Sequence, residues 1–153
     1  MTAAKRKGTA FETLLVRALG AFFRLRYGLK PYRPAQAGQD VGDLNGISPW
    51  VGQAKAFKSW EDAMRLGLDG AERQKVAAGE AYGVAFVKRP RRSVGQAYAV
   101  MTVETWARVT ARMLRAEELL SRSTTGAYAM HVAETAADLA TEFPRGTEGK
   151  ATE

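Results

Sequence analysis

The sequence predicts an α/β domain in which a mixed central β-sheet is flanked by helices and followed by a C-terminal helical tail. Three observations predict it: apolar residues recur at helical spacing over 9–26, four strand-like segments follow in two pairs, and a capped helical segment separates the pairs. With 153 residues, of which 46% are hydrophobic, the chain has the ordinary size and composition of a single core. We expect one compact domain over 1–120 and a tail over 121–153.

The first helix is expected to begin at a cap formed by Gly8 or Thr9 and to end at about Arg26. Its apolar face would be formed by Phe11, Leu14, Leu15, Ala18, Leu19 and Phe22. Glycine and proline then break the helix, and 32–38 is interpreted as an extended fragment and a loop.

Segments 41–47 and 50–57 are predicted to be two strands joined by a turn at Ser48-Pro49. Ser59 is placed to cap the next helix, because Glu61 and Asp62 in the first turn suit the positive end of the helix dipole. Gly79 is placed to end that helix.

Segments 81–88 and 96–101 are predicted to form a hairpin, after which Thr102 caps another helix. The apolar stripe of this helix is interpreted as a core face and consists of Trp106, Val109, Met113, Ala116 and Leu120. Residues 121–126 are interpreted as a linker, 128–143 as a further amphipathic helix, and the last ten residues as disordered. His131, the only histidine, lies in this tail, and we expect it to have a structural role.

The composition excludes several kinds of chemistry. The chain has no cysteine, so disulfides, thiolate zinc sites and cysteine nucleophiles are excluded, and any metal must be held mainly by oxygen. No apolar run approaches the length that spans a bilayer, and the N-terminus does not resemble a signal peptide, so we expect a soluble, cytoplasmic protein.

The formal net charge of +7 favours a polyanionic partner. Residues 1–38 contain eight Lys or Arg and the single acid Glu12, so this segment alone accounts for the whole excess. Residues 117–153 carry seven acids against three bases. The chain therefore has a basic front and an acidic tail.

Asp43, Gln53 and Lys55 are the candidate chemical group. Asp43 and Gln53 lie on strands that we expect to be neighbours, and Gln53 and Lys55 are two residues apart, which places them on one face of a strand. Phosphodiester hydrolysis needs an oxygen-ligated Mg²⁺ and an activated water, and a nearby ammonium stabilises the charge that develops on the phosphate. On this spacing alone, a solvated lysine at a sheet edge is the more common interpretation of Lys55.

Several short elements match a known family in order. They are Lys7-Gly8-Thr9-Ala10-Phe11-Glu12, Arg33-Pro34-Ala35, Gly42-Asp43-Leu44, Gln53-Ala54-Lys55 and Gln74. Over 7–109 the chain resembles the PD-(D/E)XK nucleases and, among them, the archaeal-type Holliday junction resolvases and their phage relatives. This resemblance implies a restriction-endonuclease-like core and cleavage of DNA, most directly of four-way junctions.

The resemblance also implies roles for individual residues. Glu12, Asp43 and Gln53 would hold Mg²⁺, for which Mn²⁺ can substitute, and Lys55 would assist the nucleophile. Gln53 departs from the family, because most members have Glu there, and an uncharged amide predicts weaker metal binding. The Gln-Ala-Lys triplet also resembles Mrr-like restriction nucleases, in which Gln is usual at this position.

Other assignments have alternatives. Asp40 is the alternative to Asp43, because both flank the start of one strand, and Glu12 could instead pair with a neighbouring Arg. Gln74 either positions the Gln53 or Lys55 side chain or faces solvent. Ala35 and Ala37 stand in a loop where archaeal resolvases often have Ser, so substrate handling need not be the same.

The basic residues are candidates for sequence-independent phosphate contacts with DNA. The candidates are Lys5, Arg6, Lys7 and Arg33 in the basic front, and Arg89, Arg91 and Arg92, beside Lys88, in the hairpin turn. A homodimer is expected from the family, because a junction needs two symmetric incisions. The rival functions are an Mrr-like or repair nuclease acting on duplex or flapped DNA, and a catalytically weak DNA-binding module.

Overall fold

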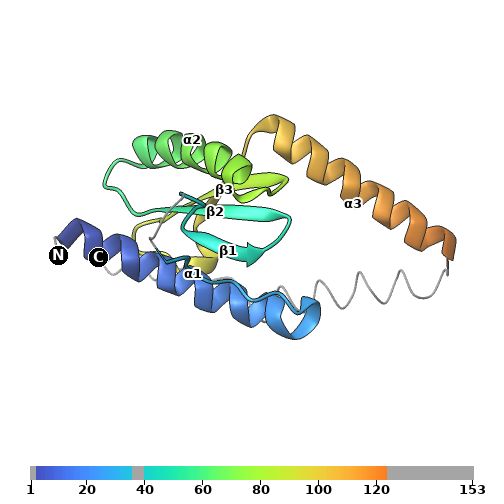
Figure 1. Cartoon of the computed structure of the whole chain (residues 1–153), viewed down its shortest axis with the longest axis horizontal. Coiled ribbons are helices and arrows are strands. Elements are labelled where there is room, and N and C mark those ends of the chain that lie inside the picture. The colour runs from blue at the N-terminus through green and yellow to red at the C-terminus, as the bar shows by residue number, and fades with distance from the viewer. Residues whose placement is uncertain (1–2, 36–39, 124–153) are drawn as a thin grey trace, which may run out of the picture. The chain divides into compact units, whose positions relative to one another are not determined.

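A computed structural model describes residues 3–35 and 40–123 of the chain (Figure 1). The chain separates into two compact units, Met1–Thr102 and Val103–Glu153. The division falls before the last described helix. The candidate chemical group lies entirely within the first unit.

The N-terminal helix α1 spans Ala3–Tyr27. The predicted end of this helix is confirmed, because Gly28 adopts a left-handed conformation with φ of 66° directly after it. The predicted start at Gly8 or Thr9 is wrong, since the helix already includes the Lys5-Arg6-Lys7 cluster. Alanine, lysine and arginine are all good helix formers, which explains the earlier start.

The sheet has four strands in the order β1-β2-β3-β4, so strands that follow one another in sequence are also neighbours in space. Strand β1 (Leu44–Ile47) pairs antiparallel with β2 (Trp50–Lys55), and the turn between them contains a cis Ser48-Pro49 bond. Strand β2 pairs parallel with β3 (Tyr82–Val87), which pairs antiparallel with β4 (Tyr98–Val100). The predicted mixed sheet is confirmed.

The segment after α1 returns to the first strand. Tyr32 forms an isolated antiparallel bridge with Asn45, through backbone hydrogen bonds of 2.9 Å in both directions. Gly46 has a φ of 77°, and a Cβ there would clash with the carbonyl oxygen of Lys30. Glycine is therefore needed where the returning segment crosses β1.

Helix α2 (Trp60–Ala78) makes the crossover between the parallel strands β2 and β3. Both predicted caps are confirmed. The Ser59 side chain accepts a hydrogen bond of 3.2 Å from the backbone N–H of Asp62, and Gly79 ends the helix with a φ of 68°.

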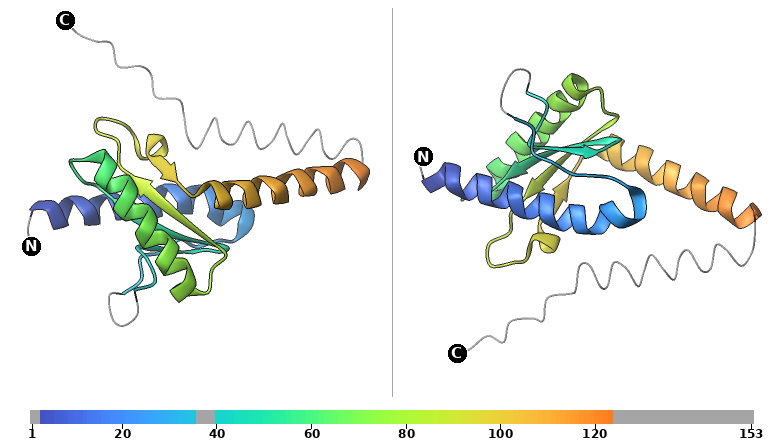
Figure 2. Two further views of the ribbon diagram at one scale, coloured as in Figure 1. Left: turned by 90° about the horizontal axis from the view of Figure 1, so that it is seen from above. Right: turned by 60° about the horizontal axis from the view of Figure 1, so that its bottom comes forward.

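The two helices of the first unit cover opposite faces of the sheet (Figures 1 and 2). Helix α1 packs through Phe11 and Leu15 against Ala54 of β2, and Phe86 of β3 joins this cluster. Helix α2 packs against β2 and β3 through buried small residues, among them Ala63 and Ala71. Since side chains alternate along a strand, Gln53 and Lys55 lie on the face opposite Ala54.

The predicted hairpin of β3 and β4 is confirmed, with a difference in its connection. A short 3-10 helix, η1 (Val94–Gln96), lies between the strands and packs against α1. Strand β4 is shorter than the predicted segment 96–101, because η1 takes up its first residue.

Helix α3 (Val103–Ser123) begins directly after Thr102, as predicted, and continues through residues that were expected to start a linker. Its predicted core stripe is exposed: Trp106 retains 59% of its accessible surface and Met113 retains 52%. The prediction of a core face is therefore wrong for the structure of this chain by itself. The predicted tail helix over 128–143, His131 and the last ten residues lie outside the described residues.

Within the described ranges, no helix combines the length and the apolar character needed to cross a bilayer.

Candidate active site

Asp43 lies at the start of β1, directly opposite β2. Its backbone N–H donates to the carbonyl oxygen of Gly52 over 2.9 Å, which fixes the residue against the neighbouring strand. Its carboxylate oxygen Oδ2 accepts a hydrogen bond of 2.9 Å from the backbone N–H of Ala54 and a second from Nε2 of Gln53. The structure therefore brings together two of the three residues that the sequence singled out.

The preceding Gly42 allows this placement. It has a φ of 95°, and a Cβ there would lie 2.6 Å from the Val51 side chain and 3.1 Å from the Gly52 carbonyl oxygen. A side chain at this position would push the start of β1 away from β2. This steric requirement explains why a glycine precedes Asp43.

Gln53 and Lys55 both extend from β2 toward helix α2, where glycines leave room for them. A Cβ at Gly70 would lie 2.8 Å from Oε1 of Gln53, and a Cβ at Gly67 would lie 3.1 Å from Cγ of Lys55. Glycine inside a helix costs about 1 kcal/mol relative to alanine, so close packing is the evident reason for both. These two glycines were not predicted to be part of the site, although their spacing of three residues in a capped helix is visible in the sequence.

The Lys55 ammonium is held beside an aromatic ring. Its Nζ lies 5.8 Å from the ring centroid of Phe57, a distance at which a cation is attracted to the ring face. The side chain is half-buried, with its stem against α2 and its charged end outward. This arrangement keeps a positive charge on the same strand face as Gln53.

Asp40 and Gln74 form a second polar pair next to the first. Nε2 of Gln74 donates to Oδ1 of Asp40 over 2.7 Å, and Gln74 is only 5% exposed. Its other amide atom, Oε1, is buried without a hydrogen-bond partner and lies near Gly42. The sequence analysis considered contacts of Gln74 with Gln53 or Lys55, and the hydrogen bond found is with Asp40.

Glu12 lies on α1, and its carboxylate oxygen Oε2 forms an ion pair of 2.6 Å with Nη2 of Arg33. This is the alternative that the sequence left open for Glu12. Across residues 3–35 and 40–123, no hydrogen bond or ion pair is recorded between Glu12 and either Asp43 or Lys55. In this structure the first-helix acid is therefore neutralised by an arginine that was expected to contact phosphate.

The remaining predicted DNA contacts lie in two places. Lys5, Arg6 and Lys7 belong to the first turns of α1, and their side chains lie outside the described part of the structure. Arg89 is stacked on Tyr98, with its guanidinium carbon 4.9 Å from the ring centroid, whereas Arg91 and Arg92 are exposed. The hairpin thus presents exposed cations at its turn.

The donors near Asp43 have the chemistry that Mg²⁺ prefers. Asp43 and Asp40 offer carboxylate oxygens and Gln53 and Gln74 offer amide oxygens, and the orphaned buried Oε1 of Gln74 is a donor atom without a partner. Among the described residues there is no group of three or more acids or histidines that could hold a metal. The ligand types around Asp43 are therefore ones that Mg²⁺ accepts, and two of them, Asp40 and Asp43, carry a negative charge.

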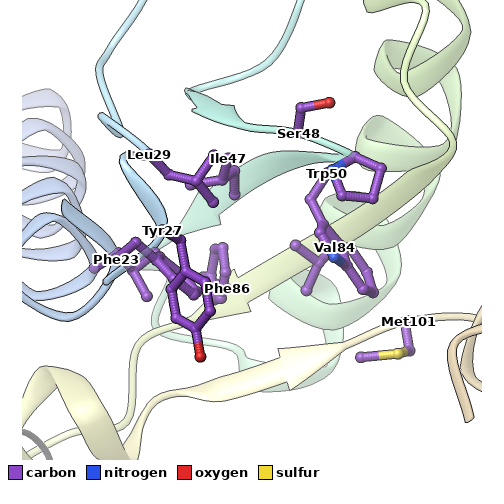
Figure 3. A pocket seen from close by; sticks show the side chains of 11 residues that line it. Phe23, Tyr27, Leu29, Ile47, Ser48, Trp50, Val84, Phe86 and Met101 are labelled. Carbon is purple, nitrogen blue, oxygen red and sulfur yellow. The ribbon is translucent and has the colours of Figure 1, made fainter. Parts of the chain in front are cut away.

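The apolar pocket of the first unit is separate from this chemistry. It has a volume of about 440 Å³ and is lined by side chains of α1 and the sheet, among them Phe23, Trp50 and Phe86 (Figure 3). Its lining is almost entirely hydrocarbon. Such a cavity cannot hold a phosphate or a metal ion, so it is not the candidate active site.

Comparison of the chain with family models, with curated proteins and with solved structures finds no match. The resemblance to the PD-(D/E)XK nucleases therefore rests on the sequence motifs alone.

Proposed function

We propose that the protein is a metal-dependent DNA endonuclease with Asp43, Gln53 and Lys55 at its active site. The observation that carries this proposal is the direct contact between Asp43 and Gln53, with Lys55 on the same strand face as Gln53. A carboxylate, an amide and an ammonium at one end of a sheet can hold a cation and a phosphate together. The mixed sheet between helices is compatible with the nuclease core that the motifs imply.

Asp43 and Gln53 would hold Mg²⁺, and Asp40 and Gln74 are further candidate ligands. The bound Mg²⁺ would act as a Lewis acid that stabilises the negative charge on the phosphate. Gln53 now presents its amide N–H to Asp43, so it must turn its carbonyl oxygen outward to ligate a cation. Lys55 donates hydrogen bonds to the non-bridging oxygens of the scissile phosphate. Water adds to phosphorus and gives up a proton, the bond to one sugar oxygen breaks, and that oxygen takes up the proton, which leaves a phosphomonoester and an alcohol.

Glu12 acts in this proposal only after it leaves Arg33. An incoming phosphate group competes with the Glu12 carboxylate for the Arg33 guanidinium, because both are anions that suit its planar fork. Arg33 would then serve as the phosphate contact that the sequence predicts, and Glu12 would be released toward the cation.

The finer proposal is a Holliday junction resolvase that works as a homodimer. The exposed stripe of α3 supports the dimer: Trp106, Met113 and Leu120 recur every seven residues, which is the spacing of a coiled-coil seam. A second copy of the chain thus offers a matching apolar stripe to cover this one.

Incubating the purified protein with four-way junction, flap and linear duplex DNA, in Mg²⁺ and in EDTA, tests this proposal. We expect metal-dependent cleavage, with paired symmetric cuts in the junction. Preferential cutting of duplex or flap would favour an Mrr-like or repair nuclease. Binding without cleavage at any Mg²⁺ or Mn²⁺ concentration would favour a DNA-binding module in which Gln53 has abolished metal binding.

A further inference from the structure

A second cleft in the first unit lies between α1 and the segment that returns to β1. It has a volume of about 470 Å³ and is lined by α1 and by Lys30 and Pro31. Three of its lining residues are cations, Arg17, Arg24 and Lys30, and none is an acid. All three are exposed.

Among the described residues, the three cations lack the carboxylate partner that several other basic residues have. Arg33, Arg65, Lys75, Arg108 and Arg122 each form an ion pair with a carboxylate. Within residues 3–35 and 40–123, the side chains of Arg17, Arg24 and Lys30 form no ion pair and no hydrogen bond. No described carboxylate offsets these three charges, so an anion that enters the cleft is attracted by all of them.

Gly20 and Ala21, which line the cleft, have no bulky side chain to fill it. A Cβ at Gly20 would meet no atom within 4 Å, so close packing does not explain this glycine. A helix-interior glycine costs about 1 kcal/mol relative to alanine. A glycine at position 20 is explained if a ligand approaches the helix backbone there, because glycine leaves that space open.

The spacing of the arginines suits a phosphate backbone. Arg17 and Arg24 are seven residues apart on α1, so their positions are about 10 Å apart along the helix axis. One strand of duplex DNA rises about 3.4 Å per nucleotide, so this distance corresponds to about three phosphates. Lys30 adds a third charge from the opposite wall of the cleft.

We propose that this cleft, formed by Arg17, Arg24 and Lys30 around Gly20, binds the phosphodiester backbone of DNA. The inference deepens the proposed function, on which it rests, by naming where the substrate is held away from the scissile bond. It assigns phosphate binding to three residues that the motif comparison did not single out. Each arginine can contact a phosphate with two parallel N–H groups, which a lysine cannot do.

DNA binding in EDTA, measured by fluorescence anisotropy over a range of salt concentrations, tests the cleft without any contribution from cleavage. Each phosphate contact adds about 0.9 to the slope of log affinity against log salt. Replacing Arg17 and Arg24 together by Ala should reduce this slope by about two and weaken binding roughly tenfold or more. Adding Lys30→Ala should reduce the slope by about one more.

The matched control is the double variant Arg65→Ala and Arg73→Ala on α2, where both residues are exposed and the same charge is removed. It should keep the wild-type slope. An equal loss of slope in this control would mean that DNA binding follows the net charge of the protein, and it would overturn the proposal that the cleft binds DNA.

Gly20→Leu gives an independent test, because it fills the open space at position 20 and keeps every charge. It should weaken DNA binding as the double arginine variant does. Wild-type affinity in this variant would show that the arginines act from the open surface, which overturns the proposal. The proposal would also be overturned if a mononucleotide competed as well as DNA at the same nucleotide concentration. A protein that binds DNA through the cleft and never cleaves it would refute the nuclease proposal alone.

Discussion

Replacing Gln53 by Glu tests the centre of the candidate site most sharply, because it turns the donor beside Asp43 into a second acceptor. In the structure, Nε2 of Gln53 donates to the Asp43 carboxylate. The variant loses a hydrogen bond to a charged group, which contributes about 1.5–3 kcal/mol. It also places two negative charges about 4 Å apart, which repel by about 4 kcal/mol at an effective dielectric constant near 20.

Asp43 is only half-buried, so solvent and side-chain rotation relieve part of this repulsion. We therefore expect a loss of about 2–4 kcal/mol in the free energy of unfolding in EDTA. For a domain of this size, that loss lowers the melting temperature by about 10 °C or more. Calorimetry or circular dichroism measures it directly.

Mg²⁺ should reverse the effect, because a cation between two carboxylates is attracted by both. The variant should gain more melting temperature from Mg²⁺ than the wild type does, and its half-maximal cleavage should need less metal. Gln53→Met removes the donor and one proposed metal ligand without adding charge, so it should lose some stability and gain less from Mg²⁺ than Gln53→Glu does. Gln96→Glu, a partly exposed control, should change stability by less than about 0.5 kcal/mol.

Two results would refute this reasoning. A wild-type melting temperature of Gln53→Glu in EDTA would mean that its side chain does not face Asp43. An equal gain from Mg²⁺ in Gln53→Glu and Gln53→Met would mean that no cation binds between these two residues.

Three further perturbations follow from the packing and the charge. Gly70→Ala places a methyl group 2.8 Å from Oε1 of Gln53, so it should cost about 1–3 kcal/mol of stability and slow cleavage. Gly20→Ala adds its methyl group in open space and should stabilise α1 by about 1 kcal/mol. Equal effects of the two variants in thermal melts would contradict the close contact at Gly70. Met113→Glu should convert a dimer to a monomer in analytical ultracentrifugation while the exposed control Ala111→Glu leaves it intact, and a monomeric wild type would end the dimer proposal. Replacing Lys5–Lys7 by Ala should reduce the salt slope of DNA binding by roughly two to three, and an unchanged slope would mean that this cluster is only solvated.

Local signals predicted much of the fold. Ser59 and Gly79 bound α2 because a hydroxyl cap and a left-handed glycine act over a few residues, and such signals are visible in the sequence. The start of α1 was missed because a good cap signal at Gly8 or Thr9 competed with favourable helix formers before it. The exposed stripe of α3 was misjudged because periodicity shows that a face is apolar and says nothing of what covers it.

The candidate site was predictable where strand geometry governs it. The pairing of β1 with β2 brings Asp43 to Gln53, and the two-residue period places Lys55 with them. The contacts between elements were not predictable: the pairing of Asp40 with Gln74, the ion pair of Glu12 and the cleft beside Lys30 all depend on tertiary packing. Each joins residues from different elements, whose separation no local pattern encodes.

Single-turnover cleavage of DNA by Asp43→Asn and Lys55→Ala tests the central claim most directly. Each variant removes one charge that the proposed reaction uses, and Asp69→Asn and Lys58→Ala remove the same charges at exposed positions. The account predicts that Asp43→Asn and Lys55→Ala each slow cleavage by about two orders of magnitude or more, with DNA binding retained, whereas both controls cleave at the wild-type rate. Wild-type cleavage by either active-site variant would contradict the account and would place the chemistry elsewhere, with Asp40 the next residue to replace.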